Sequence, residues 1–176
     1  KAACDMSLMA FARQYQFPVV FTRSANIYGP GQQLYRIIPK TVISIKLGKR
    51  VPLHGRGSSI RSFIHAKDVA SGTLKVMRLA TPPQIYRFST DRYISIHDLI
   101  GLICGQLNVS FEDTVEITEE RPGKDPAYLL DSTRARSNLG WEDKILLEDG
   151  IKETIDWIEK NFAVLRTLPL EYIHKA

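Results

Sequence analysis

Apolar residues recur along this chain at two spacings, one with the period of a helix and one with the pattern of a strand. Where they return every third or fourth position they predict helices, and where they form short runs they predict strands. Helices are expected at residues 2–15, 37–47, 66–79, 96–107, 133–140 and 147–162, and strands at 18–23, 60–65 and 85–88. Because the two kinds of element alternate, the pattern indicates an α/β chain.

A few residues set the expected ends of these elements. Pro18 ends the first helix, and Ser95 and Ser132 are suited to cap the helices that follow them, since a serine hydroxyl accepts a hydrogen bond from a free backbone N–H. The run at 18–23 is nearly continuous in apolar residues, which is typical of a strand buried on both faces of a sheet.

The composition excludes several classes of protein. With 44% hydrophobic and 24% charged residues, the chain has the make-up of a globular domain. It has no apolar run long enough to span a bilayer and no charged-then-apolar leader. We therefore expect a cytoplasmic protein with no membrane partner.

The formal charge of +5 raises the question of an anionic partner. Lysines and arginines are scattered singly, without the dense block and interleaved aromatic residues of a nucleic-acid surface, so no nucleic-acid partner is expected. Two alternatives remain. The excess charge lies on a solvated surface, or several arginines converge on a small anion such as a diphosphate, which suits the planar guanidinium group.

The cysteines Cys4 and Cys104 lie in apolar helical segments and have no neighbours at metal-ligand spacing. Free cysteine is among the most buried residue types. We therefore expect two buried thiols, with neither a disulfide framework nor a metal site.

Four segments carry a resemblance to a known family. They are residues 1–5 (Lys-Ala-Ala-Cys-Asp), 22–30 (Thr-Arg-Ser-Ala-Asn-Ile-Tyr-Gly-Pro), 55–70 and 120–125 (Glu-Arg-Pro-Gly-Lys-Asp). In this order they resemble the C-terminal half of the extended short-chain dehydrogenase/reductase family, above all its dTDP-glucose 4,6-dehydratase-like nucleotide-sugar dehydratases. The resemblance covers residues 1–162 and leaves a tail at 163–176 without a usable pattern.

The resemblance implies the C-terminal part of a Rossmann-like parallel sheet fold together with a small mixed α/β substrate-binding domain. Residues 1–34 are expected to end the NAD-binding domain. Residues 35–162 should mainly form the substrate-binding domain, with 60–90 contributing a strand and a helix back to the sheet.

Lys1 stands where the family has the lysine of its Tyr-x-x-x-Lys pair, which implies a catalytic role and contact with the nicotinamide ribose. The tyrosine would precede the first residue given. No Gly-x-Gly-x-x-Gly or Gly-x-x-Gly-x-x-Gly turn follows a strand in this chain. We therefore expect NAD to be bound mainly by the missing N-terminal half and this chain alone to be inactive. The alternative for Lys1 is a frayed, solvated residue.

Ser24 and Asn26 come directly after the apolar run at 18–23, where an open parallel sheet presents its ligand crevice. The resemblance implies that Ser24 lies beside the nicotinamide and that Asn26 donates its amide to the sugar diphosphate. The alternative is a simple turn, because Gly29 and Pro30 follow and such residues punctuate loops.

Arg36, Pro52 and His54 are further candidates from the resemblance. Arg36 would contact sugar or phosphate, and Pro52 and His54 would flank the nucleotide base in a hairpin at 51–57. His54 stands where the family more often has tyrosine, which leaves the base preference open. The alternatives are a surface arginine and a structural histidine.

Arg61 lies inside a β-patterned apolar run, where a charged side chain needs a partner. A diphosphate would provide one, and an internal ion pair with Asp68 or another acid is the alternative. Ser62 departs from the Arg-Asp pair that is common in the family.

Ser95, Arg121 and Tyr128 complete the residues that the resemblance assigns to the sugar nucleotide, with Arg121 binding phosphate. Ser95 alternatively only caps its helix, and Tyr128 is only a strand residue. Pro126 and Ala127 stand where the family usually has basic residues.

By the same resemblance we expect an NAD-dependent lyase that acts on a nucleoside-diphosphate sugar and is a homodimer in the intact protein. The sugar C4 would lose a hydride to NAD, a carboxylate would remove the C5 proton, water would leave from C6, and the hydride would return there. The tyrosine base and an Asp-Glu pair would lie in the missing half. An epimerase or decarboxylase of the same family and a non-catalytic sugar-nucleotide binding module are the alternatives.

Overall fold

The computed structural model describes residues 2–120, 122–123 and 125–173. Its helices are α1 (Ala2–Tyr15), α2 (Ile37–Lys46), α3 (Ala66–Leu79), α4 (Ile96–Leu107), α5 (Phe111–Thr114), α6 (Thr133–Leu139) and α7 (Leu147–Leu165), and a 3-10 turn, η1, covers Gly55–Gly57. Its strands are β1 (Val20–Ser24), β2 (Asn26–Tyr28), β3 (Val51–His54), β4 (Ile60–Arg61), β5 (Phe63–His65), β6 (Gln84–Phe88), β7 (Ile94–Ser95), β8 (Val115–Thr118) and β9 (Ala127–Tyr128). The helices that the apolar spacing predicted are confirmed, and the last of them continues to Leu165.

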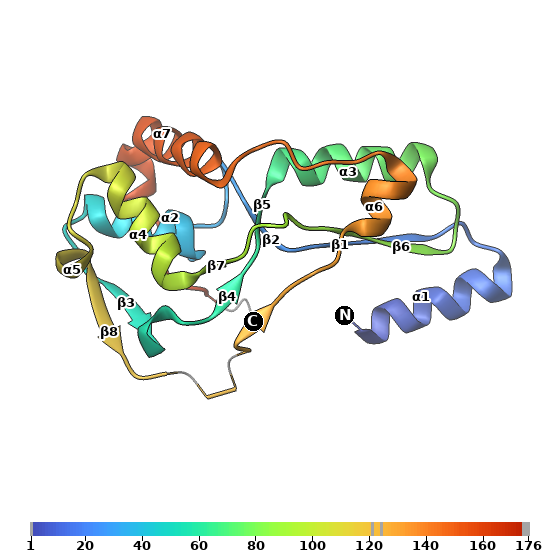
Figure 1. Cartoon of the computed structure of the whole chain (residues 1–176), viewed down its shortest axis with the longest axis horizontal. Helices are drawn as coiled ribbons and strands as arrows, with labels where there is room; N and C mark the ends of the chain where they lie inside the picture. Colours follow the sequence, from blue (N-terminus) through green and yellow to red (C-terminus); the bar gives the residue numbers. More distant parts are fainter. Residues whose placement is uncertain (1, 121, 124, 174–176) are drawn as a thin grey trace.

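Parallel strands form the centre of the fold. β1 pairs with β6 and β2 pairs with β5, both in parallel. Helix α3 connects β5 to β6 and so links the second of these parallel pairs to the first. Figure 1 shows α3 and α1 on opposite sides of the β1–β6 pair. The prediction of an α/β fold with parallel strands is confirmed.

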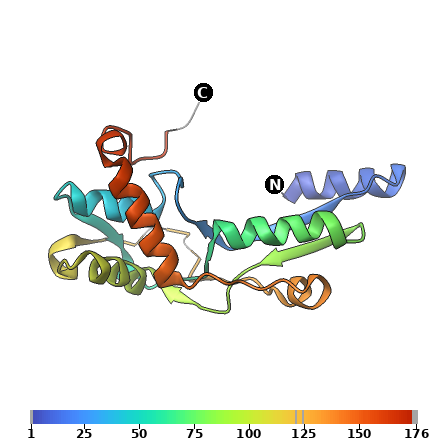
Figure 2. The same cartoon turned by 90° about the horizontal axis from the view of Figure 1, so that it is seen from above.

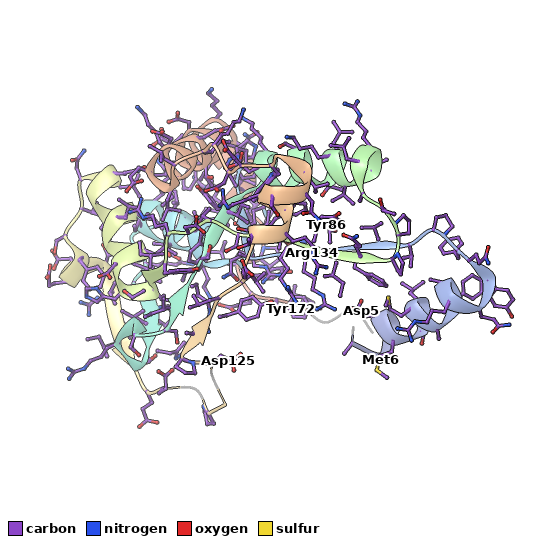
Figure 3. All side chains as sticks on the ribbon, turned by 45° about the vertical axis from the view of Figure 1, so that its right-hand side comes forward. Asp5, Met6, Tyr86, Asp125, Arg134 and Tyr172 are labelled. Atoms are coloured by element: carbon purple, nitrogen blue, oxygen red, sulfur yellow. The ribbon has the colours of Figure 1, made fainter. Side chains whose placement is uncertain are left out.

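The prediction that the strand at 18–23 is buried on both faces is wrong, because Thr22 and Arg23 are exposed. Within the described residues, only β6 pairs with β1, so one edge of β1 is open. Helix α1 covers the strand loosely, and a hollow of about 300 Å³ separates Met6 and its neighbours from Phe21. Arg23 pairs instead with Asp5, which projects from α1 beside Met6 (Figure 3).

A second group of elements packs α2, α4 and α7 together (Figure 2). Gly150 lets α7 approach β2, because a Cβ at this position would lie 2.2 Å from the hydroxyl oxygen of Tyr28. That hydroxyl donates to the carbonyl of Leu147 at 3.4 Å. Burial raises the pKa of Tyr28 above its ordinary value, so the hydroxyl remains a neutral donor.

The expected hairpin at 51–57 is wrong. β3 pairs in parallel with β8, not with the strand that follows it. The cause is the backbone of η1, in which Gly55, Arg56 and Gly57 all have positive φ and redirect the chain. The next strand, β4, therefore pairs with β7 and β9 in a separate three-stranded sheet.

The expected strand at 60–65 is divided at Ser62. The backbone carbonyl of Ser62 accepts from the backbone N–H of Asn26, while its hydroxyl lies 3.0 Å from that of Thr90. These buried bonds hold the chain where it passes from the β7–β4–β9 sheet to the β2–β5 pair. Ser62 therefore joins the two parts of the fold.

The structure also bears on the cysteines, on the cap at Ser132 and on membrane-spanning helices. Cys104 is buried as predicted, but Cys4 is exposed because it lies on the loosely packed α1. Ser132 does not cap α6, since its hydroxyl donates to the carbonyl of Ser89, and the carboxylate of Asp131 accepts from Thr133 N instead. Among the described residues, no helix combines the length and apolar character needed to cross a membrane.

Candidate functional site

A pocket of about 330 Å³ lies between the start of α2 and strand β3. Its walls combine apolar and aromatic side chains with one ammonium group and one imidazole, which suits a flat, partly apolar ligand that carries an anion. The residues that line it are Tyr35, Ile37, Lys40, Val51, Pro52, Leu53, His54 and Ile96. Two residues that the sequence nominated, Pro52 and His54, therefore lie in one pocket.

Strand pairing orients His54 at this pocket. The register of β3 on β8 sets His54 beside Thr118, and its Nδ1 lies 2.8 Å from the Thr118 hydroxyl oxygen and 3.3 Å from the carbonyl oxygen of Glu119. One edge of the ring is thus held by β8. The structural reading of His54 and the ligand reading are compatible, because the ring lines the pocket while β8 holds it.

Sequence reasoning missed Lys40, which among the described residues is the one lysine or arginine in the pocket wall. Its side chain is 21% exposed, and its ammonium lies 2.6 Å from a carboxylate oxygen of Glu171. The signal was available in the spacing, since Lys40 follows Arg36 by four positions and such residues share a helix face. Arg36 itself is exposed, with its guanidinium 5.2 Å from the centre of the Tyr35 ring.

Ser24 and Asn26 lie at the carboxyl end of β1, beside the end of β6. Both are half-buried. The amide nitrogen of Asn26 donates to the carbonyl of Ser62 at 3.1 Å, so this side chain ties β2 to the residue between β4 and β5.

Arg61 and Tyr128 are cross-strand neighbours in the β7–β4–β9 sheet. The Arg61 guanidinium donates to the carbonyls of Ile60 and Asp125, each at 2.8 Å, and Asp125 precedes β9 (Figure 3). The alternative of an ion pair with Asp68 is wrong, because that buried carboxylate accepts from the backbone N–H of Ile145. Tyr128 is a strand residue and 45% exposed.

Ser95 acts as a helix cap, and two other candidates cannot be placed. The Ser95 hydroxyl accepts from the backbone N–H of Asp98 at 3.0 Å, which confirms that Ser95 caps α4. Lys1 and Arg121 lie outside the described residues.

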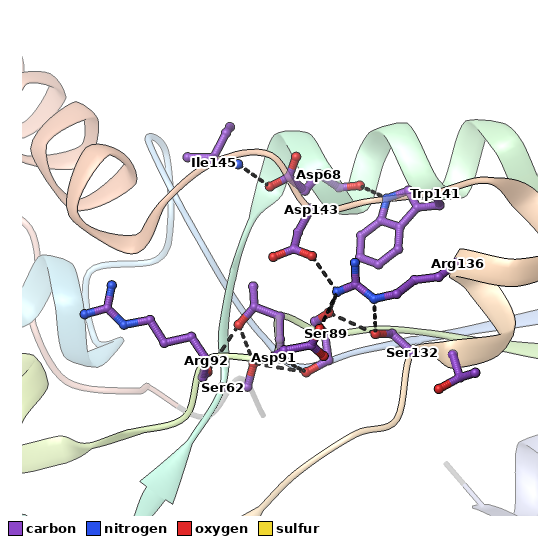
Figure 4. Close-up of polar contacts among 12 residues, drawn as sticks. Ser62, Asp68, Ser89, Asp91, Arg92, Ser132, Arg136, Trp141, Asp143 and Ile145 are labelled. Atoms are coloured by element: carbon purple, nitrogen blue, oxygen red, sulfur yellow. Dashed lines mark hydrogen bonds and ion pairs between the residues drawn. The ribbon is translucent and has the colours of Figure 1, made fainter.

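A polar cluster of buried serines with the partly buried Arg136 and Asp143 follows the end of β6 (Figure 4). The Ser89 hydroxyl donates to the Ser62 hydroxyl at 3.0 Å, and the Ser89 carbonyl accepts from Ser132 and Arg136. Arg136 also pairs with Asp143 at 2.5 Å. Sequence reasoning missed this cluster, although Ser132 and Arg136 stand four positions apart, because its other members come from distant segments.

His65 is a buried histidine beneath the turn that follows β2. It is 1% exposed, and its Nδ1 accepts from the backbone N–H of Lys67 at 3.3 Å. Its Nε2 has no hydrogen-bond partner within the part of the chain that the structure describes, and it lies 3.6 Å from a carboxylate oxygen of Glu153. Burial lowers the pKa of His65 below its ordinary value of 6.5, and Glu153 opposes that shift only in part.

We predict that this histidine makes the chain less stable in mild acid. Below about pH 6.5 the unfolded chain binds a proton at His65 that the folded chain does not bind, so stability falls as pH decreases. The free energy of unfolding, measured with urea, should decrease from about pH 7 to about pH 5.5 by less in His65→Gln than in the unmodified chain. Glu153→Gln removes the carboxylate that favours protonation and should enlarge the decrease. Equal decreases in all three proteins would contradict the prediction.

The family model described as GDP-mannose 4,6 dehydratase matches residues 1–154. The chain is 35% identical over 167 residues to dTDP-D-glucose 4,6-dehydratase of Homo sapiens, a match that covers 92% of this chain and 47% of that protein. It is also 35% identical over 161 residues to an Arabidopsis thaliana trifunctional UDP-glucose 4,6-dehydratase/UDP-4-keto-6-deoxy-D-glucose 3,5-epimerase/UDP-4-keto-L-rhamnose-reductase, covering 92% of this chain and 24% of that protein.

A solved structure agrees with these sequence matches. The dTDP-glucose 4,6-dehydratase of Streptomyces venezuelae, solved with NAD and TYD bound, aligns with a TM-score of 0.89 at 28% identity. That alignment covers 93% of this chain and 50% of the other, so the chain spans about half the length of the solved relative. The chain belongs to the GDP-mannose 4,6-dehydratase family, within the extended short-chain dehydrogenases/reductases.

Proposed function

We propose that this chain forms the C-terminal, substrate-binding portion of an NAD-dependent nucleotide-sugar 4,6-dehydratase of the dTDP-glucose 4,6-dehydratase type. The observation that carries the proposal is the pocket between α2 and β3, in which Pro52 and His54 meet Lys40. Family membership and the 4,6-dehydratase relatives support it.

In this proposal the nucleotide base lies against Pro52 and His54. A phosphate binds the Lys40 ammonium, because a point charge at the pocket wall attracts phosphate oxygens. The roles of Arg36, Asn26, Arg61, Ser95, Arg121 and Tyr128 at the sugar and diphosphate remain part of the proposal. A diphosphate contact by Arg61 is supported by the two backbone carbonyls that accept from its guanidinium, because they fix the group without neutralising its charge.

NAD fits this chain only at one edge. Ser24 lies at the carboxyl end of β1, the edge at which parallel α/β sheets bind dinucleotides. The sequence has no Gly-rich turn that could hold the pyrophosphate of NAD. In this proposal Ser24 therefore lies beside the nicotinamide, and Lys1 contacts the nicotinamide ribose. When bound, NAD would supply the hydride acceptor for the sugar C4. We propose that this chain alone binds sugar nucleotide without turnover.

The assembly and the domain division are also proposals. Helix α1 exposes Met6, Phe11 and Tyr15, with 73%, 47% and 66% of each residue accessible, which supports a homodimer through this helix. We propose that residues 1–34 end the NAD-binding domain and 35–162 mainly bind substrate.

Isothermal titration of the chain with dTDP, UDP and GDP tests the binding role. At least one diphosphate should bind, and His54→Ala should weaken that binding by about 5- to 100-fold, the range for losing one base-stacking ring. His97→Ala is the matched control, because His97 stacks on Phe111 outside the pocket. Failure of all three nucleotides to bind, or equal losses in the two variants, would sink the proposal.

Turnover by the whole protein separates the reaction types. The substrate is the sugar nucleotide that corresponds to the diphosphate that binds, supplied together with NAD. From it a dehydratase releases water and yields a 4-keto-6-deoxy sugar. An epimerase yields an isomer of unchanged mass, and a binding module yields no product.

A further inference from the structure

The segment after α7 turns back onto the start of α2. Helix α7 packs along α2, and Figure 2 shows the chain continuing from its end across to the loop that precedes α2. Leu170 packs against the main hydrophobic core, which anchors the segment. The next two residues, Glu171 and Tyr172, contact Lys40 and Tyr35.

These contacts occur at the pocket. The Glu171 carboxylate lies 2.6 Å from the Lys40 ammonium, and the Tyr172 ring meets the Tyr35 ring edge-on with centroids 5.1 Å apart. Lys40 and Tyr35 both line the pocket. The segment thus places a carboxylate on the ammonium that a phosphate would use.

The ion pair between Glu171 and Lys40 is weak enough for an anionic ligand to displace Glu171. The side chain of Glu171 is 79% exposed, and ion pairs so open to solvent contribute little to stability. A doubly charged diphosphate, held also by apolar walls, interacts more strongly with one ammonium than a single exposed carboxylate does.

We propose that residues 168–173 form a C-terminal strap whose Glu171 competes with an anionic ligand for Lys40. Ligand binding and release of the strap are then coupled, because one ammonium cannot serve both anions fully. This inference rests on the proposed function in that it takes the ligand to be a nucleoside diphosphate.

The test compares the affinities of three proteins of 176 residues and one shortened chain. Isothermal titration with dTDP, UDP and inorganic pyrophosphate should show Glu171→Gln binding each ligand about two- to fivefold more tightly than the unmodified chain, the range for removing one exposed competing ion pair. Glu159→Gln should leave the affinities unchanged, because Glu159 on α7 pairs with Lys46 at the last residue of α2, outside the pocket wall. A chain that ends at Leu168 should bind at least as tightly as Glu171→Gln.

Each other outcome has a defined meaning. If Glu171→Gln binds no more tightly, or more weakly, than the unmodified chain, the strap is not a competitor and the inference is wrong. If Glu171→Gln tightens pyrophosphate binding but nucleoside diphosphates bind no better than pyrophosphate, the strap stands and the proposed function fails. If no ligand binds any of the proteins, the strap and the proposed function both fail, because Lys40 then binds no anion even when Glu171 is replaced.

Discussion

Replacing Trp141 with alanine is expected to lower the free energy of unfolding by about 3–5 kcal/mol, the range for removing a large buried aromatic side chain. The indole is fully buried and lies 4.9 Å from the Phe88 ring, centroid to centroid. Its Nε1 donates to the backbone carbonyl of Asp68 at 3.0 Å. The substitution would therefore open a cavity between α3, β6 and α6 and leave a buried carbonyl unpaired. Urea unfolding monitored by circular dichroism measures the loss.

Two further variants make this prediction robust. Trp141→Phe keeps most of the packing but removes the hydrogen bond to Asp68, so a loss of about 1–3 kcal/mol is expected. Trp157→Phe is the control on α7, where the indole is only partly buried, and it should change stability less than Trp141→Phe does. If Trp141→Ala does not fold, the Trp141→Phe result still decides. Equal effects of the two phenylalanine substitutions would show that Trp141 has no special place in the core.

Lys40→Met should weaken binding of a nucleoside diphosphate by roughly 10- to 100-fold, because a hydrogen bond to a charged group contributes about 1.5–3 kcal/mol. Lys40 is the lysine that lines the pocket, and methionine keeps much of its aliphatic stem. Lys46→Met is the matched control on the same helix, since Lys46 pairs with Glu159. Isothermal titration of the three proteins gives the comparison.

The direction of the change in ligand affinity distinguishes two explanations of the Lys40–Glu171 ion pair. If Lys40 and Glu171 only stabilised the fold, substitution of either would change ligand affinity in the same direction. A ligand site at Lys40 predicts opposite directions, with weaker binding for Lys40→Met and tighter binding for Glu171→Gln. An unchanged affinity in Lys40→Met would remove the ammonium from the account of the pocket.

Elements with local determinants were predictable from the sequence. The spacing of apolar residues placed the helices, and the serine at position 95 caps its helix as a serine in that position should. The resemblance nominated Pro52 and His54 from motif order, and both line the pocket. Whether they bind a ligand stays a prediction.

Features that depend on distant partners were not predictable. Periodicity does not say that β3 pairs with β8, so the hairpin at 51–57 was expected wrongly. Nor does it say that Ser62 leaves the ladder to bond with Thr90, or that Lys40 lines a pocket with residues of β3. The tail beyond residue 162 has no motif, and its contact with α2 follows only from the direction in which α7 ends.

The most direct test of the account is a two-dimensional NMR titration of the chain with dTDP or UDP, following the backbone amides. The account predicts that the largest shifts occur at Lys40, Leu53, His54 and Ile96, around the pocket between α2 and β3. Shifts concentrated at Met9, Phe21 and Ile85, in the hollow beneath α1, or no shifts at saturating nucleotide, would contradict it.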